Sequence, residues 1–457
     1  MPERFEKTSM MPADAKAVFD WHCRPGAFAR LTPPWQRVRV VSTSGEVPRD
    51  GSRVELRVKL GPIWRKWLVE HESFVEGERF TDVTLEGPFP TWRHTHRVEP
   101  GDDRRCTLRD TIDYTLPGGP LAALGRGFAR RQIERGFAYR HATTAADVAT
   151  HQRAAGRRLT VAVSGASGLI GSALVALLGG GGHRVIRLVR GEARGDDEVR
   201  WSPGEGVIEH EKLEGVDAVV HLAAESIVGR WSDAKKRRVR DSRVAGTRLL
   251  AEGLARLQHK PSVLVSASAT GFYGDRGEDL LDETASPGDG FLADVARQWE
   301  AAADPARHAG IRVVHPRIGM VLTPAGGALA NVLPVFNLGL GGVLGSGRQV
   351  WPWITLDDVI DAIHFAIVTE AVEGPINFVG PERVTNREFT RTLGRVLGRP
   401  TLLPVPKAGP RMVFGELADA LLFASTDARP KALQDAGYAF RHPTLDAGLR
   451  HVLGRSA

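Results

Sequence analysis

The chain has 457 residues, of which 42% are hydrophobic and 25% charged, with a formal net charge of +7 and a pI of about 9.6. This length and composition predict a soluble globular protein of about two to four domains. The two cysteines, Cys23 and Cys106, stand far apart in no paired motif. They argue against a disulfide framework and a cysteine zinc site, and they fit a reducing compartment.

The excess of basic residues does not by itself indicate a partner. The densest run, Lys235–Arg240, falls in the helix-like stretch Ser232–Gly253. We interpret it as a solvated helix face and expect no nucleic-acid partner. The first residues contain no apolar region, and no run of about 20 apolar residues exists, so we expect neither a signal peptide nor a membrane span. The cytoplasm is the expected location.

Residues 1–145 are predicted to form an α+β domain. An early helix at about Pro12–His22 precedes a series of strands, and an amphipathic helix follows at Gly118–His141. Arg53–Leu60 alternates polar and apolar residues without exception, as a half-buried antiparallel strand does. The other expected strands are Trp64–Glu76, Arg79–Glu86, Thr91–Val98 and Cys106–Leu116. The polar stretch Thr143–Arg158 has no apolar period, so we expect the domain boundary there.

From Leu159 onward, short apolar runs alternate with helical patterns. This alternation predicts an α/β fold with a doubly wound parallel sheet of the Rossmann type, over residues 158–400, including an irregular substrate subdomain. Prolines interrupt the remaining residues, 401–457, for which we expect a small C-terminal domain of two or three short helices.

A glycine-rich turn follows the first strand of this region. Leu159–Ser164 is a short apolar run, and a helix is expected over Leu169–Leu178. The turn between them comprises Gly165, Ala166, Ser167, Gly168, Leu169, Ile170 and Gly171. Three glycines in a strand–turn–helix context permit a tight turn, a close approach to a pyrophosphate and close packing of helix and strand. The helix N-terminus offers amides to the phosphates. The sequence therefore predicts a dinucleotide site.

The next strand, Arg184–Val189, ends at Val189 and Arg190. An NAD-selective site places Asp or Glu near this point to bind the ribose 2′-hydroxyl, whereas a guanidinium suits a 2′-phosphate. We therefore expect NADP(H) as the cofactor; the alternative for Arg190 is a surface arginine without a ligand.

Several stretches resemble the extended short-chain dehydrogenase/reductases. Asp217–Ala224 is similar to the fourth strand of that superfamily, and Trp353–Asp358 to its VDDV segment. A closer resemblance, from about residue 159 to 452, is to an atypical branch, the sugar-nucleotide-epimerase-like family. It includes that family's C-terminal domain of unknown function, around Gly415–Glu416 and Pro430–Phe440. The closer resemblance is carried by Ser242–Thr247, Ser266–Asp275, Phe336–Gly342 and Gly345–Gln349.

The resemblance implies further positions at the cofactor. Arg243 is similar to a helix residue that reaches the cofactor phosphates, and Leu222 and Ala223 match backbone that lines the adenosine. The segment from Arg317 to Val321 matches residues near the nicotinamide.

The N-terminal region carries four more recognisable stretches, Leu31–Pro34, Gly87–Phe89, Trp92–His96 and Phe137–His141. On these, residues 5–141 resemble a START/Bet v1-like (polyketide cyclase or dehydrase-like) domain with a helix-grip fold. The resemblance implies a pocket for a hydrophobic ligand; a filled core or a docking module is the alternative. His94 and His96 share one face of a strand, and with no third ligand in view we interpret them as hydrogen-bonded structure. No metal is expected.

The expected chemistry needs a proton donor or acceptor beside the reacting carbon. Short-chain dehydrogenases use a Tyr four residues before a Lys, together with a Ser. Ser268 stands where this Ser is expected, at the end of a strand over Ser262–Ser268. The Tyr–Lys pair is absent, since the matching positions are Phe291 and Val295. Tyr273 is the nearest candidate acid or base; water, Ser268 and the substrate are alternatives, and Tyr273 also fits a packing role.

The substrate region departs from nucleotide-sugar epimerases. Those enzymes often carry an arginine two places after a GDGxQ motif, where this chain has Trp351, although Arg348 within the motif can still pair with a phosphate. Trp351, Trp353 and the apolar run Ile354–Leu356 favour a partly apolar substrate over a UDP-sugar.

Two functions remain open on this basis. One is an NADP(H)-dependent oxidoreductase or epimerase that acts on a small, partly apolar carbonyl or alcohol. The other is a catalytically silent NADP(H)-binding sensor or ligand carrier, which the missing Tyr–Lys pair favours.

Overall fold

The computed structural model describes residues 2–102, 104–118 and 122–455. The chain divides into two units. The first holds the chain up to Gly156 together with Gly179–Gly182, and the second holds Arg157–Leu178 and His183–Arg455. No helix among the described residues has the length and apolar character needed to cross a membrane.

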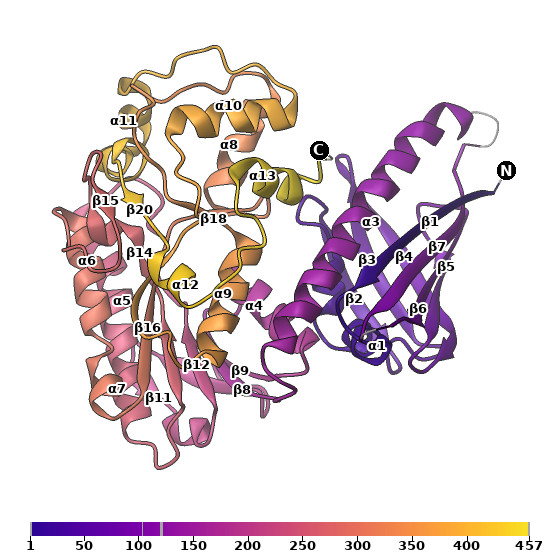
Figure 1. The fold of residues 1–457 in the computed structure, drawn as a ribbon, viewed down its shortest axis with the longest axis horizontal. Coiled ribbons are helices and arrows are strands. Elements are labelled where there is room, and N and C mark those ends of the chain that lie inside the picture. Colours follow the sequence, from indigo (N-terminus) through magenta and orange to yellow (C-terminus); the bar gives the residue numbers. More distant parts are fainter. Residues whose placement is uncertain (1, 103, 119–121, 456–457) are drawn as a thin grey trace. The chain divides into compact units, whose positions relative to one another are not determined.

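The first unit is an antiparallel sheet with three helices. Its seven strands follow the order β1-β7-β6-β5-β4-β3-β2, and the long helix α3 lies across the sheet (Figure 1). Along β7 every second side chain is buried, which is the pattern of a sheet with one covered face. This arrangement confirms the predicted α+β helix-grip fold. The elements are β1 (Glu3–Met11), α1 (Ala15–Cys23), α2 (Ala27–Leu31), β2 (Val38–Ser44), β3 (Arg53–Leu60), β4 (Ile63–Val75), β5 (Arg79–Glu86), β6 (Thr91–Pro100), β7 (Cys106–Thr115) and α3 (Ala122–Gln152).

Helix α3 continues to Gln152, so the predicted end at His141 is wrong. The physical reason is that its last turns bury polar groups. Arg30 of α2 donates two hydrogen bonds, of 2.7 and 2.9 Å, to the carboxylate of Asp147, and both side chains are buried. A search for an apolar period misses this stretch, because an ion pair takes the place of apolar packing.

The second unit is built on a nine-stranded sheet in the order β11-β10-β9-β8-β12-β13-β16-β14, with β19 also paired to β16. All pairs are parallel except β10 with β11. The first strand, β8, lies in the middle, with β9 and β10 on one side and β12, β13 and β16 on the other. This order confirms the predicted Rossmann fold. The strands are β8 (Thr160–Ser164), β9 (Arg184–Val189), β10 (Glu198–Ser202), β11 (Val207–Ile208), β12 (Ala218–His221), β13 (Val263–Ser266), β14 (Ser268–Ala269), β16 (Arg312–Ile318) and β19 (Gly374–Phe378).

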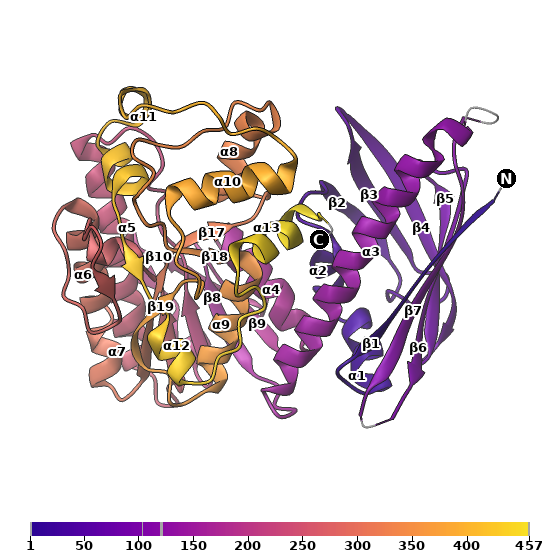
Figure 2. The same cartoon turned by 45° about the horizontal axis from the view of Figure 1, so that its top comes forward.

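Helices cover both faces of this sheet (Figure 2). On one face Val161 and Val163 of β8 share an apolar core with α4 and α9, and on the other Ala162 shares a core with α5 and α7. The alternation of neighbouring residues between two cores explains why the strand is apolar throughout. The helices are α4 (Leu169–Gly180), α5 (Asp233–Ala255), α6 (Phe291–Ala301), α7 (Asp304–His308) and α9 (Leu356–Val368).

Smaller elements lie outside the nine-stranded sheet. A two-stranded parallel sheet, β17 with β18, shares an apolar core with α8, α10 and α13, and the short strand β15 pairs with β20 near the C-terminus. These elements are β15 (Leu280–Leu281), β17 (Met320–Leu322), α8 (Gly327–Asn337), β18 (Trp353–Thr355), α10 (Asn386–Leu397), α11 (Ala408–Phe414), β20 (Asp427–Ala428), α12 (Lys431–Asp435) and α13 (Leu445–Leu453).

Candidate functional site

The strand order of the second unit reverses between β8 and β12, and ligands of open α/β sheets bind outside the carboxyl ends of the strands at such a point. The glycine-rich turn lies there. Gly165 has a φ of 69°, and its carbonyl accepts a 2.9 Å hydrogen bond from the amide of Gly168. A Cβ atom on Gly165 would lie 2.8 Å from the amide nitrogen of Ala223. Only glycine fits at this position.

Gly171 lies in the first turn of α4, where a Cβ atom would stand 2.1 Å from the carbonyl oxygen of Gly165. The first amides of an α-helix have no acceptor within the helix, and the helix dipole places positive potential at that end. Leu169, Ile170 and Gly171 supply such amides beside the turn that Ala166 and Ser167 complete. The turn has the shape and polarity to hold the diphosphate of a dinucleotide.

The end of β12 forms a second wall of this turn. The hydroxyl oxygen of Ser164 accepts hydrogen bonds from the amides of Leu222, at 3.1 Å, and Ala223, at 3.3 Å. Its hydrogen points to Nδ1 of His221, 2.6 Å away. Burial lowers the pKa of His221 to about 4, so the ring is neutral and has one nitrogen able to accept a hydrogen bond. Sequence reasoning missed Ser164 and His221; the one available signal was a histidine inside an otherwise apolar strand.

The second strand ends at Val189, which is half-buried, and Arg190, which is exposed. Because β9 is the direct neighbour of β8, this end lies at the same edge of the sheet as the glycine turn. The Arg190 guanidinium is accessible to a ligand there.

Arg243 of α5 braces the loop that follows β12. Its Nη1 donates to the carbonyl oxygens of Glu225, at 2.9 Å, and Val239, at 3.0 Å. Its guanidinium carbon lies 5.0 Å from the ring centroid of Trp299. Burial lowers the pKa of Arg243 to about 10, which leaves the side chain charged at neutral pH.

Ser268 and Arg317 meet at one carboxylate. The Ser268 hydroxyl donates a 2.7 Å hydrogen bond to Oε1 of Glu300, and Arg317 donates from Nε and Nη2, both at 2.9 Å, to the two oxygens of the same group. Ser268 and Arg317 are each 3% exposed. Such a bidentate arginine–carboxylate pair fixes the orientation of the carboxylate. Here it also fixes the orientation of the Ser268 hydroxyl, which donates to the same carboxylate. Glu300 was not predicted as a site residue.

Tyr273 lies on the other side of Arg317. Its hydroxyl accepts a 3.0 Å hydrogen bond from Nη1 of Arg317 and lies 2.7 Å from Oδ1 of Asn377. The side chain has no exposed surface, and burial raises the pKa of its hydroxyl. The structure thus links the two predicted catalytic residues, Ser268 and Tyr273, through Glu300 and Arg317.

Val321 lies in β17, beside the start of α8. A Cβ on Gly327 would lie 3.7 Å from the carbonyl oxygen of Val321 and also 3.7 Å from a methyl group of Leu169. Ile170, Leu222 and Val321 pack against the same apolar core. The structure therefore brings Val321 near the glycine turn.

Three families match parts of this chain. The NAD dependent epimerase/dehydratase family matches residues 161–379, the polyketide cyclase/dehydrase and lipid transport family residues 11–139, and a domain of unknown function, DUF1731, residues 405–452. The epimerase family protein of Mycobacterium bovis is 44% identical over 65% of this chain and 98% of its own length. This chain belongs to the NAD-dependent epimerase/dehydratase family. The matches confirm the three predicted resemblances.

Two solved structures of relatives extend the comparison. A Corynebacterium glutamicum protein described as a nucleoside-diphosphate sugar epimerase is 34% identical, with a TM-score of 0.80 over 98% of this chain and 90% of that one. The human epimerase family protein SDR39U1, solved with NADPH, is 33% identical, with a TM-score of 0.58 over 64% of this chain and 99% of that one.

In this epimerase-family protein, Phe291 begins α6 at the position of the expected tyrosine. Its ring centroid lies 5.2 Å from that of Trp231 and 5.4 Å from Nζ of Lys236, and Val295, at the position of the expected lysine, is buried. The usual acid–base pair is replaced by apolar groups, as the sequence indicated.

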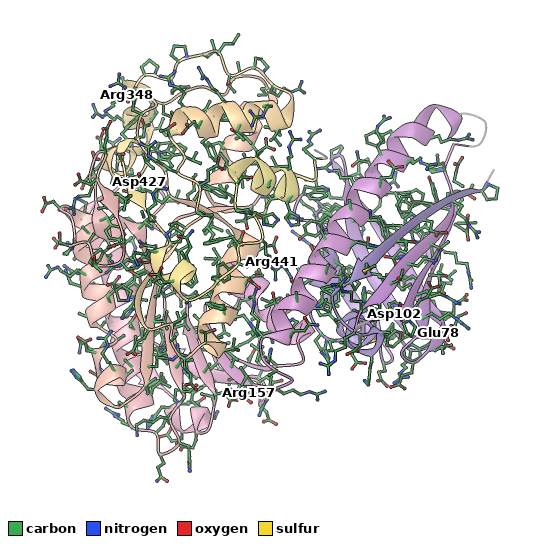
Figure 3. The ribbon with its side chains drawn as sticks, in the orientation of Figure 1. Glu78, Asp102, Arg157, Arg348, Asp427 and Arg441 are labelled. Atoms are coloured by element: carbon green, nitrogen blue, oxygen red, sulfur yellow. The ribbon has the colours of Figure 1, made fainter. Side chains whose placement is uncertain are left out.

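The region expected to meet the substrate is also apolar. The Trp351 ring lies 5.4 Å from that of Phe389, and its Nε1 donates to the carbonyl oxygen of Leu422 at 3.3 Å. Arg348 is exposed, at the edge of this unit (Figure 3).

The C-terminal segment reaches the Tyr273 network from outside the sheet. The side-chain amide of Asn377 donates to the carbonyl oxygen of Arg429 at 2.9 Å, and the amide of Ala432 donates to the Glu283 carboxylate at 3.2 Å. Asp427, which Figure 3 labels, accepts hydrogen bonds from Arg383 and Arg429.

Proposed function

We propose that this protein binds NADP(H) at the turn Gly165–Gly171 and uses it to oxidise, reduce or epimerise a small, partly apolar carbonyl or alcohol. The observation that carries the cofactor choice is the exposed Arg190 guanidinium at the end of β9, where a 2′-phosphate can pair with it. The NADPH in the structure of the human relative supports the same choice.

In this proposal Gly165–Gly171 hold the diphosphate, Leu222 and Ala223 line the adenosine, and Arg317–Val321 lie near the nicotinamide. Arg243 holds the loop after β12 in place beside the phosphates. Bound NADP(H) supplies hydride transfer. The protein's own part is to position the substrate oxygen and to move its proton.

Ser268 is the group that we propose for the substrate oxygen. Its hydrogen is committed to Glu300, so its oxygen accepts the hydrogen of a substrate hydroxyl. A proton from that hydroxyl then passes through Ser268 to the Glu300 carboxylate, and returns by the same route in the reverse reaction. Tyr273 is a positioning residue here, because its buried hydroxyl holds Arg317, which in turn holds Glu300.

Apolar surroundings select the substrate in this proposal. Trp351 stands where a phosphate-binding arginine is frequent, and Trp353 and Ile354 follow it in the buried strand β18. The domain similar to polyketide cyclases and lipid transport proteins would supply a hydrophobic ligand.

The second candidate is an NADP(H)-binding sensor or carrier without turnover. The specific observation in its favour is the replacement of the usual Tyr and Lys by Phe291 and Val295, neither of which exchanges protons.

The oxidation of NADPH by purified protein, measured with a panel of aldehydes and ketones, separates the two candidates. The enzyme proposal expects turnover with at least one apolar carbonyl and a large loss in Glu300→Gln, which interrupts the proton route. Asp294→Asn, on the same helix but paired with Arg297 at the surface, is the matched control. NADPH binding without turnover across the panel supports the sensor. Calorimetry that detects no binding of NADPH contradicts both.

A further inference from the structure

A group of histidines and aspartates lies inside the first unit, apart from the nucleotide site. Strand pairing places His71 of β4 opposite Asp82 of β5, and Asp82 opposite His94 of β6. His96 is two residues further along β6, on the same face, and pairs with Asp110 of β7. His94, His96 and Asp110 are all less than a tenth exposed. Four adjacent strands therefore direct polar groups to one buried point.

The side chains of Asp82, His94 and His96 face one another at separations longer than ordinary hydrogen bonds. Oδ2 of Asp82 lies 3.6 Å from Nδ1 of His94 and 3.6 Å from Nε2 of His96. These separations exceed the usual range of a hydrogen bond. One ligand atom from each of the three residues lies within 4.8 Å of the others. Ligands held at about 2.0–2.1 Å from a tetrahedral Zn²⁺ stand roughly 3.4 Å apart, so the spacing suits an ion shared between them.

The opposite sides of the same groups are held by neighbours. Nε2 of His94 makes a 3.0 Å hydrogen bond to Oδ1 of Asp110, and Nδ1 of His96 lies 2.7 Å from the same oxygen. His71 Nε2 lies 3.2 Å from Oδ1 of Asp82. Metal-binding histidines almost always give their second nitrogen to a carboxylate or carbonyl, which orients the ring and selects the nitrogen left for the metal. Here Asp110 serves both rings, and its other oxygen, Oδ2, lies 2.7 Å from Nε2 of His141 in α3.

We propose that Asp82, His94 and His96 bind a divalent first-row transition-metal ion, with Zn²⁺ as a suitable member of that class. Two imidazole nitrogens and one carboxylate oxygen suit Zn²⁺ or Fe²⁺, and three protein ligands leave a position for water or an organic ligand. Asp82 and Asp110 each place a negative charge beside the ion, which a buried dication needs. The Asp82 side chain is 24% exposed, which gives the ion a way in.

The test uses the full-length protein without an affinity tag, dialysed against a chelator and titrated with Zn²⁺ in a calorimeter. We expect one equivalent to bind, and Asp82→Asn and His96→Gln each to weaken binding at least tenfold. Asp113→Asn is the matched control, because Asp113 belongs to the same sheet but pairs with Arg4 at the surface. It should bind Zn²⁺ like the wild type. Asp110→Asn should weaken binding by roughly 10–100-fold, the effect of removing a carboxylate that orients a ligand.

Circular dichroism establishes that each variant is folded. If the ligand variants do not fold, the absorption spectrum of Co²⁺ in the wild-type protein decides, since a four-coordinate site with nitrogen ligands gives intense bands that hydrated Co²⁺ lacks. Wild-type protein that binds neither Zn²⁺ nor Co²⁺ overturns the proposal. It is also overturned if folded Asp82→Asn and His96→Gln bind Zn²⁺ as tightly as the wild type.

Discussion

Gly171 packs directly onto the carbonyl oxygen of Gly165, so that a Cβ atom on Gly171 would stand 2.1 Å from it. Gly171→Ala must therefore displace the turn or the start of α4. We expect NADPH affinity to fall at least tenfold, which corresponds to about 1.4 kcal/mol, as measured by calorimetry. Gly204→Ala is the control, since a Cβ atom on Gly204 would meet no described residue within 4 Å apart from its chain neighbours. Equal NADPH affinity in both variants would contradict the placement of the diphosphate.

Arg190 is expected to choose between the two nicotinamide coenzymes. Arg190→Ala should weaken the binding of NADPH by roughly 1–3 kcal/mol, the scale of a hydrogen bond to a charged group, and leave that of NADH unchanged. Arg184→Ala, at the other end of β9, should change neither. Titration of all three proteins with both coenzymes checks this, and a wild-type protein without preference for NADPH would refute the assignment.

Tyr273→Phe separates a positioning role from an acid–base role. The variant loses the hydroxyl between Arg317 and Asn377. We expect the free energy of unfolding in urea to fall by about 1–3 kcal/mol, because a buried donor and acceptor lose their partner. Any turnover should change only severalfold. Tyr114→Phe serves as the control for a buried tyrosine, because its hydroxyl makes no hydrogen bond with a described residue. Loss of all turnover from a folded Tyr273→Phe protein would instead make Tyr273 the acid.

His221 should make the second unit sensitive to acid. Its pKa in the folded protein is about 4 because of burial, against an ordinary value of 6.5. As the pH falls, His221 is therefore protonated in the unfolded chain before it is protonated in the folded protein. The free energy of unfolding contributed by the neutral ring is fully present above pH 6.5, and about 3 kcal/mol of it at most is lost as the pH falls towards 4. His221→Asn keeps an acceptor for Ser164 and removes the titration. Urea unfolding at several pH values measures the free energy of unfolding, which should depend less on pH in His221→Asn than in the wild type. In His308→Asn, a substitution at an exposed site, the pH dependence should equal that of the wild type.

Local patterns were sufficient for the parts of the site that lie within one strand–turn–helix unit. The turn Gly165–Gly171 and the end of β9 follow from apolar runs, glycine spacing and the known geometry of parallel sheets. The strand predicted over Ser262–Ser268 is wrong in its end, because β13 stops at Ser266 and Ser268 begins the separate short strand β14.

The site contacts that were not predicted from the sequence join residues far apart in the chain. Glu300 meets Ser268 only because α6 packs beside β14, and Asp82 meets His94 only through the pairing of β5 with β6. The edge strands β1 and β2 were also unpredicted, since they carry charged or exposed residues and no long apolar run. Contacts of this kind have no local signature, because they are set by packing and register.

The hydrogen bonds from Asn377 to Arg429, and from Ala432 to Glu283, limit how the protein can be shortened. A fragment that stops at residue 400 retains every glycine of the nucleotide turn. It nevertheless deprives the buried Asn377 amide and the half-buried Glu283 carboxylate of partners that the last fifty or so residues supply. Biochemists who dissect this chain should therefore keep β20 and α12 attached to the Rossmann sheet, and judge any shorter version by its folding before its activity.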